Sequence, residues 1–394
     1  MKKNSIMSLL MILILASFIF MLNAAINHSQ VDEGQAEIIC RVIEADDSDM
    51  VISGVVMLGS QSLKGEVIGG RFDGQTIRFS NSLIGQAEFD QHYEVGDRVL
   101  VGANIENGRI TSAVAVDYVR QNYIVLLFGI FAVMLLLYAG KIGLRAILSF
   151  IISVLIIWIV LIPCLLSNYP AMPITILTLV MLSAVIIFSV AGFSKKAISA
   201  FFGSITGIII PVALAYLFGA LMNIDGMSAP YATTLLLRGY TSLNMQDIFY
   251  CAIMIGASGA CMDIAMDVAA AMEEVQVKRP DISRKELVKS GFNVGKSVIG
   301  TMATTLLLAY SGSYLMLMML FKVSETSLVR LLNMKIFTIE VMRVLIGSIA
   351  LLLVAPLTAF IYGMISCKSK KTADDKACSP CSVKDACAQD LIGR

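Results

Sequence analysis

Charged residues are scarce in this chain. Only 15% of its 394 residues are Asp, Glu, Lys or Arg, and the mean hydropathy is +0.80. This composition excludes an ordinary soluble protein, because one soluble core needs far less apolar material. The formal net charge is +1 and leaves no footprint for a nucleic acid, which we exclude as a partner. The sequence therefore predicts an integral membrane protein surrounded by a lipid bilayer.

Histidine is also scarce, with two residues in the chain, His28 and His92. Both are expected outside the membrane and the helix-borne acids inside it, so no Ser/His/Asp arrangement can be assembled. An intramembrane aspartyl protease would need two Asp on two facing helices, and here both lie on one. The stretch "SGFNVGKS" is not a phosphate-binding loop, because Ser290 stands where that motif needs Gly. We therefore do not expect an enzyme.

Eight apolar runs are long enough to cross a bilayer, for which roughly 20 residues are needed. Lys and Arg gather in the connections on one side, which places both termini in the cytoplasm by the positive-inside rule. Alternatively, the first run is a cleaved secretion signal, since lysines precede it and small residues follow it. The predicted spans are 6–26, 122–140, 146–166, 171–193, 197–221, 248–270, 297–321 and 341–366.

Residues 27–121 differ from the rest of the chain in their pattern of apolar and turn-forming residues. Runs rich in Val and Ile are broken by Gly, Asn and Asp, as in "GQTIRFSN" and "VGDRVLVGANIENGRI". With "ENG" as a hairpin signal, they predict a small barrel or sandwich, and "YEVGDRVLV" is typical of barrels of the oligonucleotide/oligosaccharide-binding (OB) type. The stretch "EADDSD" at 44–49 lacks the Gly and the bidentate Glu of a calcium loop, so a solvated turn is expected.

The predicted fold class is thus an α-helical polytopic membrane protein of about eight spans with a small all-β extracytoplasmic domain. Its predicted parts are an N-terminal membrane helix (1–26), the extracytoplasmic β-domain (27–121), a seven-helix membrane domain (122–366) and a cytoplasmic tail (367–394).

The stretch "GASGACMDIAMDVAAAMEEV", residues 256–275, reads as a membrane helix that contains Asp263 and Asp267. At 100° per residue, the two carboxylates share a face with Gly256 and Gly259, a small-residue stripe that allows close helix packing. An ionised carboxylate in hydrocarbon costs about 2.5 kcal/mol or more. It must therefore face protein, water or a cation, or hold a proton. We interpret this face as a cation or proton site.

The next span carries a polar stripe that includes Gly300 as a second packing position. Because the two helices are antiparallel neighbours of matching depth, we expect carboxylate to face hydroxyl between them. The alternative is helix-helix hydrogen bonding alone, with Asp267 paired to Lys296. In the last span, Pro356 is expected to kink the helix and free backbone carbonyls. The predicted neutral oxygen ligands are Asn293, Ser297, Thr301 and Thr304.

Three motifs in order resemble the signatures of the YibE/F-like family of bacterial multipass membrane proteins. They are the 256–275 stretch, "SGFNVGKSVIGTMATTLLLAYSGSYLMLMMLF" and "RVLIGSIALLLVAPLTAFI", and the similarity covers residues 120–365. The resemblance implies this architecture and a location in the bacterial cytoplasmic membrane, but no reaction or substrate. The matching positions are Asp263, Asp267, Asn293, Gly300, Thr304, Arg343, Gly347, Pro356 and Thr358. We interpret Arg343, three residues after Glu340, as half of an ordinary helical ion pair.

The tail contains a cysteine cluster. A cytoplasmic location is reducing, so metal ligation is favoured over disulfides. The C-x-x-C pair fits zinc or iron, although a second such pair is missing. The predicted ligands are Cys378, Cys381 and Cys387, with Cys367 as a fourth. The alternatives are an unstructured tail or a lipidated Cys367.

Two functions fit these patterns. The first is a secondary transporter or permease with a cation- or proton-linked site between the sixth and seventh spans, whose substrate is a small ion or small molecule. The second is a non-transporting membrane scaffold whose β-domain binds an envelope protein. A homo-oligomer is compatible with both.

Overall fold

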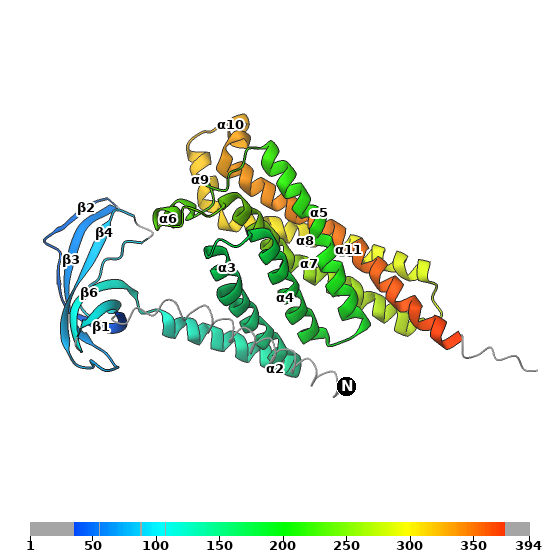
Figure 1. Cartoon of the computed structure of the whole chain (residues 1–394), viewed down its shortest axis with the longest axis horizontal. Coiled ribbons are helices and arrows are strands. Elements are labelled where there is room, and N and C mark those ends of the chain that lie inside the picture. The colour runs from blue at the N-terminus through cyan, green and yellow to red at the C-terminus, as the bar shows by residue number, and fades with distance from the viewer. Residues whose placement is uncertain (1–34, 55, 87–88, 107, 375–394) are drawn as a thin grey trace, which may run out of the picture. The chain divides into compact units, whose positions relative to one another are not determined.

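The computed structural model describes residues 35–374 apart from 55, 87–88 and 107 (Figure 1). The predicted span 6–26 and the tail from 375 onward lie outside these residues. The described chain forms two compact units that divide between Gly143 and Leu144. The first unit contains six strands: β1 (Gln35–Asp46), β2 (Met50–Ser53), β3 (Val56–Val67), β4 (Thr76–Ile84), β5 (Arg98–Glu106) and β6 (Arg109–Tyr118).

Five of these strands close into a barrel. The order is β1-β5-β6-β4-β3, and β3 pairs back to β1. All neighbouring strands are antiparallel except β4 and β6, which run parallel where Ser80 meets Val114. The short strand β2 forms a hairpin with β3. Of the two predicted architectures, the barrel is therefore the one that forms.

Alternation along β4 illustrates why these residues form strands. Phe79, Asn81 and Leu83 are buried, while Ser80 and Ser82 between them are exposed. Successive strand residues point to opposite faces, so one face of the strand builds the core. That core also contains Cys40, where burial raises the pKa of the thiol to about 11. The barrel has its own apolar core, formed by Cys40, Val42, Leu63, Val67, Phe72, Phe79, Tyr93, Val99, Val101, Ala103 and Ala113.

The rest of the described chain is helical. The α-helices are α2 (Gln121–Leu155), α3 (Ile162–Leu166), α4 (Ala171–Ala191), α5 (Lys195–Leu221), α6 (Ala232–Leu237), α7 (Met245–Lys278), α8 (Arg284–Ser313), α9 (Leu315–Val323), α10 (Leu328–Asn333) and α11 (Lys335–Asp374). A π-helical segment, η1 (Ile156–Leu161), joins α2 to α3.

Among the described residues, five helical segments are long and apolar enough to cross a membrane, or six if α8 and α9 count as one bent span. The chain is therefore an α-helical membrane protein with a β-barrel domain. The first segment, Gln121–Leu166, has 46 residues. This is more than twice the roughly 20 residues that one crossing needs. Gly140 inside it has φ 55° and ψ −122°, a non-helical conformation that glycine tolerates. This break falls at the last residue of the predicted span 122–140, before the predicted span 146–166 begins.

The structure differs from the prediction at the span 297–321. There α8 ends at Ser313 and α9 begins at Leu315, and the two helices are bent by 67° relative to each other. Tyr314 between them has φ −112° and ψ 18°. The residues just before the bend, Ser311, Gly312 and Ser313, have low helix propensity, which explains why the helix stops there.

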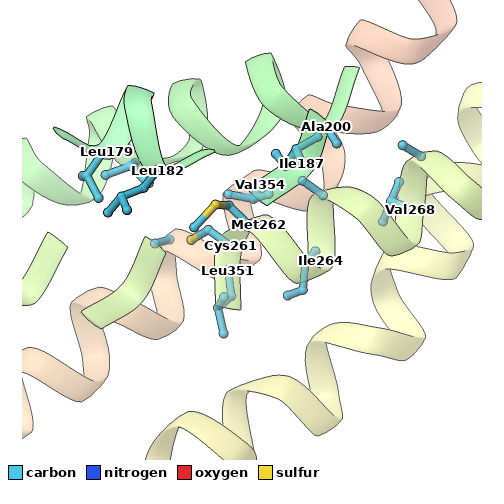
Figure 2. Close-up of a cluster of buried hydrophobic side chains, with 14 of the residues drawn as sticks. Leu179, Leu182, Ile187, Ala200, Cys261, Met262, Ile264, Val268, Leu351 and Val354 are labelled. Atoms are coloured by element: carbon cyan, nitrogen blue, oxygen red, sulfur yellow. The ribbon is translucent and has the colours of Figure 1, made fainter. Parts of the chain in front are cut away.

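Helix α7 lies at the centre of the largest apolar cluster (Figure 2). Close packing of this kind stabilises helices in a bilayer, where the surrounding lipid is as apolar as the side chains. One face of α7 is thus committed to the bundle and the opposite face is left outward. Figure 2 labels Cys261, Met262, Ile264 and Val268 of α7 with Leu179, Leu182 and Ile187 of α4, Ala200 of α5, and Leu351 and Val354 of α11.

Helices α5 and α11 approach most closely at two glycines of α5. A Cβ atom on Gly203 would lie 3.0 Å from the Cα atom of Thr358, and one on Gly207 would lie 3.0 Å from the Cα atom of Val354. The two glycines are one helical turn apart, so together they form a small-xxx-small contact. Side-chain atoms of Thr358 and Val354 lie closer still, with the backbone of α11 directly behind them.

Candidate functional site

Asp263 and Asp267 lie on the outward face of α7. Both residues are exposed, whereas Ile264, Ala265 and Val268 beside them are fully buried. Within the described residues, neither carboxylate makes a hydrogen bond or an ion pair. They stand four residues apart on one helix face, where two like charges repel each other. The pair is therefore uncompensated by protein groups in this part of the chain.

The predicted ligands on α8 are also exposed. Each hydroxyl donates to its own helix backbone: Ser297 to the carbonyl of Asn293 at 3.3 Å, Thr301 to that of Val298 at 2.9 Å, and Thr304 to that of Gly300 at 3.1 Å. Such bonds satisfy a hydroxyl inside a membrane helix without a partner helix. They leave the oxygen lone pairs free to accept from a proton donor or to ligate a cation.

Helices α7 and α8 pack through other residues. The Cβ site of Gly291 lies 2.5 Å from the sulfur of Met272, and that of Gly295 lies 3.8 Å from Cγ2 of Val268. Because the two helices run antiparallel and Gly295 lies beside Val268, a residue five positions further along α8 is level with a residue five positions back along α7. Gly300 is therefore level with Asp263. At 100° per residue, however, the predicted ligands lie about 120° to 180° around α8 from Gly295. The two helices thus present their polar stripes on the outward surface, and among the described residues no hydrogen bond joins a carboxylate of α7 to a hydroxyl of α8.

The four residues predicted for packing or kinking have different surroundings. The position of a Cβ on Gly256 is contacted by the hydroxyl of Tyr310 from α8, whereas Gly259 and Gly300 have nothing within 4 Å of theirs. The close packing expected at Gly259 and Gly300 stays a prediction. Pro356 lies inside α11, which continues past it to Asp374.

A second polar cluster, which we call the outer cluster, was not predicted as a site. It consists of Glu340 and Arg343 near the start of α11, Tyr310 in the last turn of α8, and Tyr314 between α8 and α9. The i,i+3 spacing of Glu340 and Arg343 correctly predicted their ion pair, which is 3.3 Å long. The spacing gave no sign of the aromatic rings, since these come from other helices. Only the fold brings Phe249, Tyr310 and Tyr314 around Arg343, so no local pattern in the sequence marked this cluster.

The predicted metal ligands Cys378, Cys381 and Cys387 lie outside the described residues, and the side chain of Cys367 is not described. Across the part of the chain that the structure covers, no group of three or more His, Cys, Asp or Glu side chains is arranged to hold a metal.

The stretch "EADDSD" in the barrel was considered as a calcium loop and expected to be a solvated turn. In it, Asp47 accepts a hydrogen bond from Gln61 at 2.8 Å and pairs with His92 at 3.1 Å. The bond from His92 is the main cause that lowers the pKa of Asp47.

Two family models together match most of the chain. The model described as YibE/F-like protein matches residues 127–368, and that of the YibE/F family N-terminal domain matches residues 38–118. The chain belongs to the YibE/F-like family. The first match contains the whole of α4 to α10, and with them both polar stripes and the outer cluster. The second covers the barrel of this YibE/F-like protein from β1 to the end of β6.

Searches of curated proteins and of solved structures found no match to this YibE/F-like chain. Its function must therefore be argued from its own residues.

Proposed function

We propose that this protein is a secondary transporter or permease of the bacterial cytoplasmic membrane, in which the outward face of α7 binds a cation or a proton. The observation that carries the proposal is the exposure of Asp263 within a helix that is otherwise apolar enough to span a membrane. Asp263 is the binding or titrating group, and Asp267 one turn away shares its charge or proton.

The physical argument is one of cost. A charged side chain at the centre of a membrane helix costs about 2.5 to 3.5 kcal/mol on insertion scales and more in simulations. Two such groups on one face, beside a stripe of Asn, Ser and Thr on α8, are tolerated where water or a cation replaces lipid. A water-filled groove along α7 and α8 meets that requirement, and it is what a transport path needs.

We place this groove in a protein of eight spans with both termini in the cytoplasm. The break at Gly140 supports counting Gln121–Leu166 as two crossings, and the predicted span 6–26 adds one more. In this topology the barrel is extracytoplasmic. We assign it to the OB type, because omitting β2 gives strand order 1-2-3-5-4-1 with strands 3 and 5 parallel.

Flux measurements test the proposal. The purified full chain is placed in liposomes that contain a pH-sensitive or ion-sensitive dye, and gradients of protons, sodium or potassium are applied. We expect flux above that of empty liposomes, and a loss of about tenfold or more in Asp263→Asn, because the amide removes the negative charge that binds the cation or proton; tenfold corresponds to about 1.4 kcal/mol. Glu274→Gln, an exposed acid further along α7, is the matched control and should retain flux. Unchanged flux in Asp263→Asn, or no flux in the unaltered chain, would contradict the proposal.

The scaffold function remains the second candidate because of one feature of the barrel. Val51, Leu58 and Ile84 are cross-strand neighbours on β2, β3 and β4, and their exposed fractions are 64%, 48% and 59%. An exposed apolar row of this kind is typical of a surface that meets another protein. If flux is absent and deletion of residues 31–121 abolishes a co-purifying envelope protein, the scaffold is the better description.

A further inference from the structure

The outer cluster is a built polar site inside apolar surroundings. Nη1 of Arg343 donates to the hydroxyl of Tyr314 at 3.2 Å and to Oε2 of Glu340 at 3.3 Å. The side chains of Arg343 and Glu340 are only 14% and 13% exposed. The guanidinium also lies over three aromatic rings, those of Phe249, Tyr310 and Tyr314, with its carbon 5.7 to 5.9 Å from their centroids. Rings and carboxylate together thus form surroundings that accept a cation.

The cluster is not saturated by its own members. Among the described residues, Nε of Arg343 and the hydroxyl of Tyr310 are buried without a hydrogen-bond partner. The bond between Arg343 and Glu340 is made through one nitrogen and one oxygen, not through the parallel pair of bonds that makes the strongest contacts of this type. The carboxylate of Glu340 therefore keeps lone pairs for a second partner.

A cavity of about 280 Å³ adjoins this cluster. Its polar lining is Glu340 with the hydroxyl-bearing residues Tyr310, Ser311 and Tyr314, whereas Arg343 is not among its lining residues. The rest of the wall is apolar and includes Phe337. A molecule in the cavity therefore meets the carboxylate and the rings before it meets the guanidinium.

We propose that this cavity binds an organic cation, meaning a protonated or quaternary amine with apolar substituents. The carboxylate of Glu340 attracts the positive nitrogen, and aromatic rings within about 6 Å of a cation add to that attraction. The apolar wall accepts the substituents. An anion is disfavoured, because the charged group in the wall is a carboxylate. The cation approaches Glu340 from the cavity, while Arg343, which does not line it, keeps its single bond to the carboxylate.

This site is separate from Asp263 and does not rest on transport. On α7, Gly256, whose Cβ position Tyr310 contacts, lies seven residues from Asp263, about 10 Å along the helix. The same amine chemistry occurs in dissolved amines and in phosphatidylethanolamine headgroups, and the experiment below distinguishes these two sources.

The test is calorimetric titration of the full chain in lipid nanodiscs with benzyltrimethylammonium. We expect saturable binding, at least tenfold weaker in Glu340→Gln and unchanged in Glu325→Gln, an exposed acid in the loop after α9. Because Glu340→Gln leaves Arg343 buried without its carboxylate, Val344→Phe is the second variant. It fills the cavity without removing the ion pair, and it should also abolish binding.

The remaining control is a probe of similar size and opposite charge. Benzenesulfonate, an anion of similar size, should not bind. Equal binding of both probes, or full binding in both Glu340→Gln and Val344→Phe, would overturn the proposal, since the cavity would then lack charge selectivity or lie elsewhere. If phosphatidylethanolamine in the nanodisc weakens benzyltrimethylammonium binding, the occupant is a lipid amine. If the lipid has no effect on saturable, charge-selective binding, the occupant is a dissolved amine.

Discussion

Replacing Gly203 by leucine is expected to prevent assembly of the helical bundle. A Cβ atom there would contact Oγ1 of Thr358 and lie 3.0 Å from the Cα atom of the same residue. Thr358 is fully buried, and its backbone belongs to α11, so neither group can move aside cheaply. Overpacking a tight core costs about 1–3 kcal/mol or more, and a whole leucine side chain exceeds one added methyl. The measurement is the yield of monodisperse protein in detergent together with its melting temperature.

A matched variant separates the contact from the general effect of losing a glycine. Gly129 in α2 has nothing within 4 Å of its Cβ position. Gly129→Leu should therefore give normal yield and a nearly unchanged melting temperature. Equal behaviour of the two variants would mean that α5 and α11 do not meet at Gly203.

Replacing Gln61 by leucine is expected to unfold the β-barrel. The side chain of Gln61 is fully buried and makes four hydrogen bonds. Its Nε2 donates to Asp47 at 2.8 Å and to the carbonyl of Tyr93 at 2.7 Å, and its Oε1 accepts from the backbone of Tyr93 and from Asn81, both at 3.2 Å. Leucine would leave the backbone N–H and carbonyl of Tyr93 unpaired, at about 1–3 kcal/mol for each buried group, whereas Asp47 and Asn81 keep His92 and Gln91 as partners.

Limited proteolysis of the full chain measures this effect, because an unfolded barrel exposes cleavage sites between residues 35 and 118. We expect rapid cleavage in Gln61→Leu and intact protein in Ser62→Ala, the exposed neighbour on β3. Cleavage at the same rate in both variants would show that the polar network contributes nothing to the stability of the barrel.

The network around Gln61 also marks a limit of sequence reasoning. Alternation of apolar and polar residues predicted the strands, but it assigns a polar side chain to the outer face of the barrel. Gln61 and Asn81 point inward instead, because each finds a partner on a different strand or in the loop before β5. Only the closed barrel brings these groups together, so no local pattern could have shown it.

The positions of the helices agree closely with the apolar runs of the sequence, because a run of about 20 apolar residues in a membrane has few alternatives to a helix. The bend at Tyr314 was not predicted, because Ser311, Gly312 and Ser313 are too few and too weakly polar to interrupt the apolar run around them. The polar stripe of α8 was visible from its spacing. The direction of this stripe is set by Gly291 and Gly295, because α8 packs against α7 through these two small residues on its opposite face.

Whether water reaches Asp263 is the question on which the proposed function depends. The most direct measurement is modification of Asp263→Cys by a membrane-impermeant thiol reagent that reacts only in water. The variant is made in a chain whose eight cysteines have been replaced by serine. Leu352→Cys on α11, where the leucine is 57% exposed, is the lipid-facing control. We predict modification at position 263 from at least one side of sealed vesicles and none at 352. Equal inertness at both positions would place Asp263 against lipid or protein and contradict the account.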